Sequence, residues 1–146
     1  MLLAALATIR AEAEPFLPLT EAQSRFNTSP GGHAFDLYDH RADLGNLGAP
    51  DGAVFRGRGY VQLTGRANYA HYGTRLSLPL LANPSLAADP EPAARILAAF
   101  LSEKQDAIRA ALAQNDLARA RRLVNGGSNG LDRFTAAYTT GLKLLA

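Results

Sequence analysis

Two glutamates in this 146-residue chain, Glu12 and Glu21, have the residue type and the spacing that acid–base chemistry requires. Glu12 ends an apolar segment just before Pro15, and Glu21 follows nine residues later in a polar stretch. A carboxyl group at a buried helix end can have its pKa raised enough to donate a proton near neutrality, while an ionised carboxylate can activate water. Inverting hydrolysis of a glycosidic bond needs such a pair, about 6.5–9.5 Å apart. The spacing alone also fits two surface charges, because the chain has 13 acidic residues.

Other catalytic and metal-binding patterns are missing from the sequence. The chain has no cysteine, which excludes a disulfide scaffold, a thiolate nucleophile and a zinc site built on sulfur. The spacing of His33, His40 and His71 matches no metal motif, and no serine lies in a GxSxG elbow. Residues 57–59 begin like a dinucleotide-binding motif, but Gln62 replaces its last glycine. We therefore expect no metal and no cofactor.

The composition is that of a globular domain. With 47% hydrophobic and 19% charged residues, the chain falls outside the disordered class. Its 15 basic and 13 acidic residues leave a net charge of +2, which is too small to indicate a nucleic-acid partner. No apolar run reaches the roughly 18 residues that cross a bilayer. We expect one domain over residues 1–146, monomeric and not integral to a membrane.

Apolar periodicity and capping residues predict a mainly helical chain. The expected helices span residues 2–13, 64–72, 90–112, 117–125 and 131–145. Thr64, Asp89 and Asp116 are the expected N-caps, and Gly73 is expected to close the second helix. A bend is expected near residues 102–105.

Two segments carry other signals. Residues 16–53 are rich in Gly, Pro, Asn, Asp and Ser and predict a long loop, which in a compact domain indicates a function. Residues 54–63 are the stretch expected to form a short strand or hairpin. The apolar residues 1–9 could belong to a signal peptide, but no basic region precedes them and Arg10 follows at once, which favours a helix.

A motif in the middle of the chain is more specific than the spacing of the acids. Residues 55–69, FRGRGYVQLTGRANY, resemble the GRGxxQLTxxxNY signature of glycoside hydrolase family 19, which plant-type chitinases share with bacterial and phage endolysin-like lysozymes. Residues 10–12, 83–86 and 123–133 are similar to further family elements in the same chain order. The resemblance covers nearly the whole chain.

The resemblance implies a mainly α (α+β lysozyme-like) fold: a compact helical domain with a long active-site loop and at most a short β-hairpin. It implies that Glu12 is the general acid and Glu21 the general base of an inverting hydrolysis. Thr64 would help to hold the attacking water. Gln62 and Asn68 would contact N-acetyl or hydroxyl groups of the sugar.

Further residues receive expected roles from the same resemblance. Asn125 would contact sugar, and Arg133 would lie near the acid and tune its pKa. Tyr69 either contacts substrate or packs in the core. We expect Arg58 to be a scaffold residue whose guanidinium donates hydrogen bonds to loop carbonyls.

Two glycines and a basic cluster are interpreted from their physical properties. Gly57 and Gly59 let the backbone turn tightly and approach a sugar closely, although an ordinary turn is the alternative. The arginines within residues 119–122 are interpreted as a solvated helix face that favours the helix C-terminus.

The sequence around Glu12 departs from the family pattern. The family's His-Glu-Thr-Gly-Gly is replaced here by AEAEP at residues 11–15, so the polar neighbours of the acid are missing and Glu14 lies two residues away. The chain also begins almost at the catalytic helix, which indicates either a minimal member or a shortened start.

The preferred function is hydrolysis of β-1,4 links in an N-acetylhexosamine polymer. Peptidoglycan is preferred, because the lack of cysteine, the short gap between the glutamates and the NGGxNGL ending resemble endolysins; chitin or chitooligosaccharides are the alternative. A lytic transglycosylase, for which Glu21 would be dispensable, and an inactive glycan-binding relative are further alternatives. We expect a protein made in the cytoplasm without a recognisable signal peptide that acts at the cell wall, or outside the cell, after release.

Overall fold

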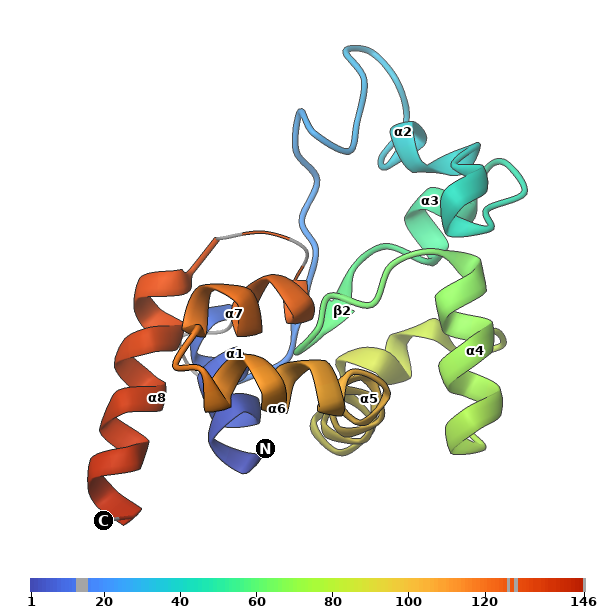
Figure 1. Ribbon diagram of the computed structural model, residues 1–146. Helices are drawn as coiled ribbons and strands as arrows, with labels where there is room; N and C mark the ends of the chain where they lie inside the picture. Colours follow the sequence, from blue (N-terminus) through green and yellow to red (C-terminus); the bar gives the residue numbers. More distant parts are fainter. Residues whose placement is uncertain (13–15, 126, 128, 146) are drawn as a thin grey trace. The chain divides into compact units, whose positions relative to one another are not determined.

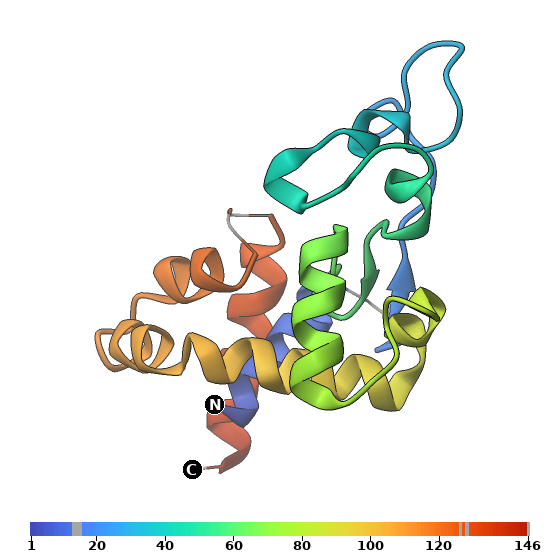
Figure 2. The ribbon, with the colours of Figure 1, turned by 90° about the vertical axis from the view of Figure 1, so that its right-hand side faces the viewer.

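The computed structural model describes residues 1–12, 16–125, 127 and 129–145, with Asn125 described by its backbone alone. The described residues form eight α-helices, two short 3-10 helices and one two-stranded sheet. Contacts between Cα atoms divide the chain into two compact units (Figure 1, Figure 2). Unit 1 comprises Met1–Leu17 and Leu97–Ala146, and unit 2 comprises Pro18–Ile96. The single domain expected over residues 1–146 stays a prediction.

Unit 1 is helical. Its helices are α1 (Leu2–Glu12), the end of α5 (Pro90–Glu103), α6 (Gln105–Ala113), α7 (Leu117–Asn125) and α8 (Leu131–Leu145). The core around Phe134 includes small side chains from three of them, among them Ala7, Ala111 and Ala120. Small side chains let helix backbones approach closely, and α1 packs along α8 in this way.

The buried face of α1 is made of alanines rather than leucines. Ala4, Ala7 and Ala11 recur at helical spacing and are almost completely buried. Leu2, by contrast, is 73% exposed. On α8, a Cβ at Gly141 would lie 2.5 Å from Cδ2 of Leu3, so Leu3 occupies the space that the glycine leaves between the two helices.

The predicted boundaries of these helices are largely confirmed. Asp116 caps α7, because its Oδ1 accepts the backbone N–H of Arg119 at 2.8 Å. The predicted bend near 102–105 is the break between α5 and α6 at Lys104.

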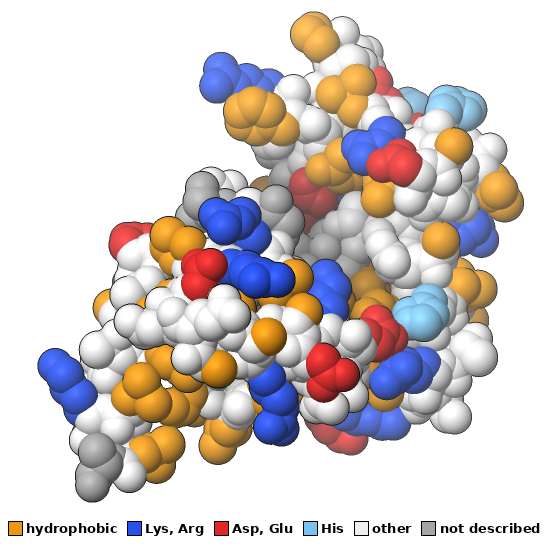
Figure 3. All heavy atoms as spheres, in the orientation of Figure 1, with side chains coloured by type: hydrophobic (Ala, Val, Ile, Leu, Met, Phe, Trp, Pro, Cys, Tyr) orange, Lys and Arg blue, Asp and Glu red, His pale blue; other side chains and the backbone are white. Residues whose placement is uncertain are grey.

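None of the described helices is long and apolar enough to cross a bilayer. On the face drawn in Figure 3, basic side chains are scattered among acidic and apolar ones.

Unit 2 contains the sheet and most of the short elements. Its elements are β1 (Leu19–Thr20), α2 (Asp36–Asp39), the 3-10 helix η1 (Ala42–Leu44), α3 (Asp51–Val54), β2 (Arg58–Gly59), α4 (Arg66–Leu76), the 3-10 helix η2 (Pro84–Ala88) and the start of α5. The strands are antiparallel, with Leu19 opposite Gly59. The short strand or hairpin expected near 54–63 is therefore present: β2 pairs with β1, and Arg58 also forms an antiparallel bridge with Leu63 inside the segment.

Two predictions about α4 are wrong. Thr64 does not cap the helix, because its hydroxyl donates to the carbonyl of Gln62 and Gly65 occupies the N-cap. Gly73 does not close it either, since α4 continues to Leu76 and its C-cap is Ser77. Capping patterns identify local candidates, and tertiary packing decides among them.

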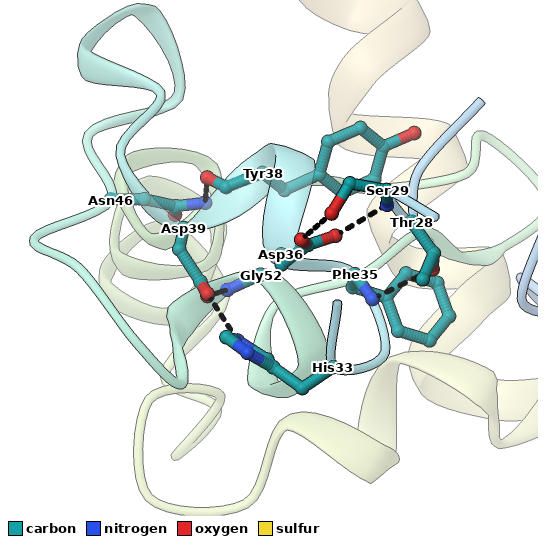
Figure 4. A network of polar contacts seen from close by, with 9 residues as sticks. All are labelled: Thr28, Ser29, His33, Phe35, Asp36, Tyr38, Asp39, Asn46 and Gly52. Carbon is teal, nitrogen blue, oxygen red and sulfur yellow. Dashed lines mark hydrogen bonds and ion pairs between the residues drawn. The ribbon is translucent and has the colours of Figure 1, made fainter. Parts of the chain in front are cut away.

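The predicted loop is held in shape by buried carboxylates. Between residues 21 and 53 it carries only short helical turns (Figure 1, Figure 2). Asp39 is buried, accepts the N–H of Gly52 at 2.8 Å, and lies 2.6 Å from Nε2 of His33 (Figure 4). The half-buried Asp36 accepts the N–H of Ser29 at 2.7 Å. These bonds replace the regular secondary structure that the segment lacks.

A bidentate ion pair joins the loop to α4. Arg66 donates to both carboxylate oxygens of Asp51, from Nε at 2.7 Å and from Nη2 at 2.5 Å. Asp51 is buried and also accepts the N–H of Leu47 at 2.8 Å. The Arg66 guanidinium, with this N–H, lowers the pKa of the Asp51 carboxyl below its ordinary value, although burial opposes the shift.

We expect Asp51→Asn to destabilise the fold by about 2–3 kcal/mol, because it leaves a bidentate pair incomplete. A lowered pKa in the folded state stabilises the protein above the unfolded value of about 3.9 and loses this effect as the pH falls further. Urea unfolding of variant and parent should therefore differ at pH 7 and converge in acid. Asp43→Asn is the control, because its pair with Arg41 is exposed. An equal decrease in the free energy of unfolding in both variants would contradict the prediction.

Candidate active site

Glu21 follows β1 directly and is bound to the backbone of Gly57. Its N–H donates to the Gly57 carbonyl at 2.8 Å, and its Oε2 accepts the Gly57 N–H at 3.0 Å. The other carboxylate oxygen, Oε1, accepts hydrogen bonds from Nδ2 of Asn27 at 3.0 Å and from the hydroxyl of Tyr38 at 2.9 Å. Three donors from three segments therefore fix the position of this half-buried carboxylate.

Tyr38 and Asn27 are functional candidates that the sequence motifs do not identify. Burial and the neighbouring Glu21 carboxylate raise the pKa of Tyr38 to about 12. The phenol therefore stays protonated and keeps donating to Glu21 across the physiological pH range. No motif could have marked these residues, because their role depends on how the loop folds back onto Glu21.

The space above Gly57 is surrounded by three polar side chains. A Cβ at this position would lie 2.8 Å from Oε1 of Gln62, 3.1 Å from Oε2 of Glu21 and 3.3 Å from Oγ1 of Thr64. Three of the predicted site residues are thus brought together within unit 2. A glycine is needed here because any side chain would fill the space on which they converge.

The turn after β2 orients Gln62, Thr64 and Asn68. Nε2 of Gln62 donates to the carbonyls of Gly59 at 3.0 Å and Leu19 at 3.2 Å. The Thr64 hydroxyl donates to the Gln62 carbonyl at 2.8 Å, so towards a water molecule this oxygen can act as an acceptor. Asn68 is exposed on the first turn of α4, and its Nδ2 donates to the Thr64 carbonyl at 2.8 Å.

Arg58 and Tyr69 form the support beneath this turn. Nη1 of Arg58 donates to the carbonyl of Val54 and to the hydroxyl of Tyr69, both at 2.8 Å, which confirms the predicted scaffold role. Tyr69 is completely buried and donates to the carbonyl of Arg56 at 2.8 Å. Burial also raises its pKa. Of the two roles expected for Tyr69, the structure corresponds to the core residue and not to a side chain exposed to substrate.

Glu12 is the last residue of α1 and belongs to unit 1. Its side chain is 25% exposed, and Oε1 accepts a hydrogen bond from Nη2 of Arg121 at 2.5 Å. Arg121 is itself anchored to the carbonyl of Asn129, through Nε at 3.0 Å and Nη2 at 2.8 Å. Together these contacts connect the end of α1 with α7 and the segment before α8.

The interpretation of residues 119–122 as a solvated face is wrong for Arg121, whose side chain is only 1% exposed. A signal for this existed in the sequence. Leu117, Ala120, Arg121 and Val124 share one helical face, and Ala120 and Val124 are buried. A cation within the apolar stripe of a helix requires hydrogen-bond acceptors within reach, which here are the Glu12 carboxylate and the Asn129 carbonyl.

The remaining predicted site residues belong to unit 1 or lie outside the described residues. Arg133 is exposed on the first turn of α8. Glu12 forms its ion pair with Arg121. The side chain of Asn125 lies outside the described residues, as does Glu14. Among the described residues, no cluster of three or more acidic or histidine side chains is suited to a metal ion.

No protein-family model matches the chain. Its structure is similar to that of chitinase C from Streptomyces griseus HUT6037, with a TM-score of 0.66 and 24% sequence identity. The match covers 99% of this chain but only 58% of the chitinase, so the chain spans less than two thirds of its length. The chain therefore has the mainly helical, lysozyme-like fold that the family resemblance predicts.

Proposed function

We propose that the protein is a glycoside hydrolase of the family 19 type that cleaves β-1,4 links in N-acetylhexosamine polymers at the cell wall. The observation that carries this proposal is the convergence of the Glu21, Gln62 and Thr64 side chains around Gly57. A fixed carboxylate, a hydroxyl acceptor and an amide oxygen are the groups needed to orient a water molecule next to a sugar. The fold shared with a chitinase supports the same assignment.

In the proposed inverting mechanism, Glu21 acts as the general base. It removes a proton from a water molecule that Thr64 helps to orient, and the water oxygen bonds to the anomeric carbon from the face opposite the leaving group. As the bond from the anomeric carbon to the leaving oxygen breaks, Glu12 donates a proton to that oxygen. Water and the glycosidic bond are consumed, and two shorter sugars are released.

We propose peptidoglycan as the polymer, with chitin as the alternative. The short gap between the glutamates and the absence of cysteine favour peptidoglycan. The similar structure is that of a chitinase, which favours chitin. A glycan-binding relative without catalysis is a further candidate, because Arg121 occupies Oε1 of Glu12. A proton donor would have to present such an oxygen to the leaving group.

Glu12→Gln and Glu21→Gln should each reduce the release of new reducing ends by about 100-fold or more, because each removes a proton-transfer group and retains the shape of the side chain. The assay compares purified peptidoglycan with soluble chitin, and circular dichroism checks the fold. Retained activity in Glu21→Gln with 1,6-anhydro products would establish a transglycosylase instead. Sugar binding by the parent protein without any bond cleavage would refute the hydrolase proposal.

Tyr38→Phe should lower kcat about three- to tenfold with little effect on KM, because it removes one of the three donors that position Glu21. Tyr138→Phe is the matched control, since this ring stacks on Phe134 in unit 1. Steady-state kinetics on the better polymer make the comparison. A loss of the same size in both variants would show that the effect is not specific to Glu21.

Gly57→Ala should abolish most activity, because the new methyl group would lie 2.8 Å from Oε1 of Gln62 and 3.1 Å from Oε2 of Glu21. Gly127→Ala is the control, since a Cβ there would meet no atom of the described residues within 4 Å. Reducing-end release and thermal unfolding are measured for both variants. Full activity in Gly57→Ala would mean that the space above this glycine is not used.

A further inference from the structure

A hollow in unit 2 is lined in part by two arginines and has no role in the proposed chemistry. It has a volume of about 370 Å³ and lies between α3, the approach to β2 and the start of η2. The described residues that line it include Arg56, Arg58, Asn83 and Ser85, and none of its described lining residues is acidic. We call it the Arg56–Arg58 pocket.

Both guanidinium groups of the pocket are held in place. Nη1 of Arg56 donates to the carbonyl of Ala53 at 2.8 Å, and its Cζ lies 5.5 Å from the ring centroid of Phe35. The Arg58 guanidinium lies 5.8 Å from the ring centroid of Tyr69, whose hydroxyl it also contacts. Among the described residues, the hydrogen bonds of both side chains involve Nη1, so the remaining N–H donors can serve a ligand.

The opposite wall of the pocket is positioned by Gly59. This residue has a φ of +78°, and a Cβ added to it would lie 2.5 Å from the carbonyl oxygen of Ala87 in η2. The start of η2 carries Asn83 and the exposed Ser85, whose hydroxyl donates to Oδ1 of Asn83 at 2.5 Å. The pocket therefore combines two fixed cations with neutral polar groups.

The electrostatics of the pocket favour an anion. Burial and the neighbouring charge of Arg58 lower the pKa of Arg56, and Tyr69 and Glu21 oppose this shift only in part. Two like charges confined together repel each other, and a bound anion would relieve the repulsion. A planar carboxylate matches the paired donors of a guanidinium and can accept two parallel hydrogen bonds from it.

We propose that the Arg56–Arg58 pocket binds a carboxylate group of an anionic glycan, such as one carried by a peptide attached to the sugar chain. This inference deepens the proposed function, on which it rests for the identity of the substrate. Chitin is neutral, whereas peptidoglycan carries carboxylates on its peptides. The pocket therefore provides a physical means of distinguishing the two polymers.

The test is calorimetric titration of the full chain with a disaccharide-peptide from peptidoglycan, in its free-acid form and with its carboxylates converted to amides. The free acid should bind about tenfold more tightly. Arg56→Gln and Asn83→Asp should each remove this preference. Asn83→Asp leaves both arginines intact, so it tests the pocket even if Arg56→Gln folds poorly. Arg119→Gln changes the net charge by the same amount on exposed α7 and should retain the preference.

Equal affinity for the acid and the amide would overturn the proposal. An equal loss of the acid preference in Arg119→Gln would overturn it as well. Inorganic phosphate and acetate are then compared as competitors of the disaccharide-peptide. Stronger competition by phosphate would overturn the assignment to a carboxylate. Bond cleavage is measured separately on neutral chitooligosaccharides. Cleavage without an acid preference would refute only the proposed carboxylate site. An acid preference without cleavage of any polymer would refute only the proposed hydrolase function.

Discussion

The reciprocal bonding between Glu21 and Gly57 is the constraint on which the candidate site depends. One backbone bond and one side-chain bond join the residue after β1 to the residue before β2. Each strand has only two residues, and such a short ladder is weakly stable by itself. The carboxylate that is proposed to act as base thus also ties together the segment that carries it and the motif around it.

The long loop has two roles that are difficult to combine in a segment with little regular structure. It must remain a loop, so that Asn27 and Tyr38 can reach Glu21 from one side. It must also stay rigid, because a displaced donor would move the carboxylate. Buried aspartates satisfy both requirements, since Asp39 and Asp51 bond backbone N–H groups that no helix or strand would otherwise satisfy.

Buried arginines recur in both units, each with a different partner. Arg121 is paired with Glu12 and the carbonyl of Asn129. Arg58 is held by carbonyls and by Tyr69. A buried guanidinium must be matched by acceptors, so these residues restrict the conformations of the segments around them. The Arg56–Arg58 pocket differs because two cations share one space.

The sequence by itself determined the helical class, most helix boundaries and the main polar positions of the site. These follow from local rules: helical periodicity, the Asp116 cap, and a motif whose residues are neighbours in the chain. Only the tertiary structure decided which distant groups meet them. The Thr64 hydroxyl donates to the Gln62 carbonyl instead of capping α4. Tyr69 is buried in the core. Arg121, and not Arg133, forms the ion pair with Glu12. Such choices depend on burial and on partners separated by up to 109 residues, and no local pattern encodes them.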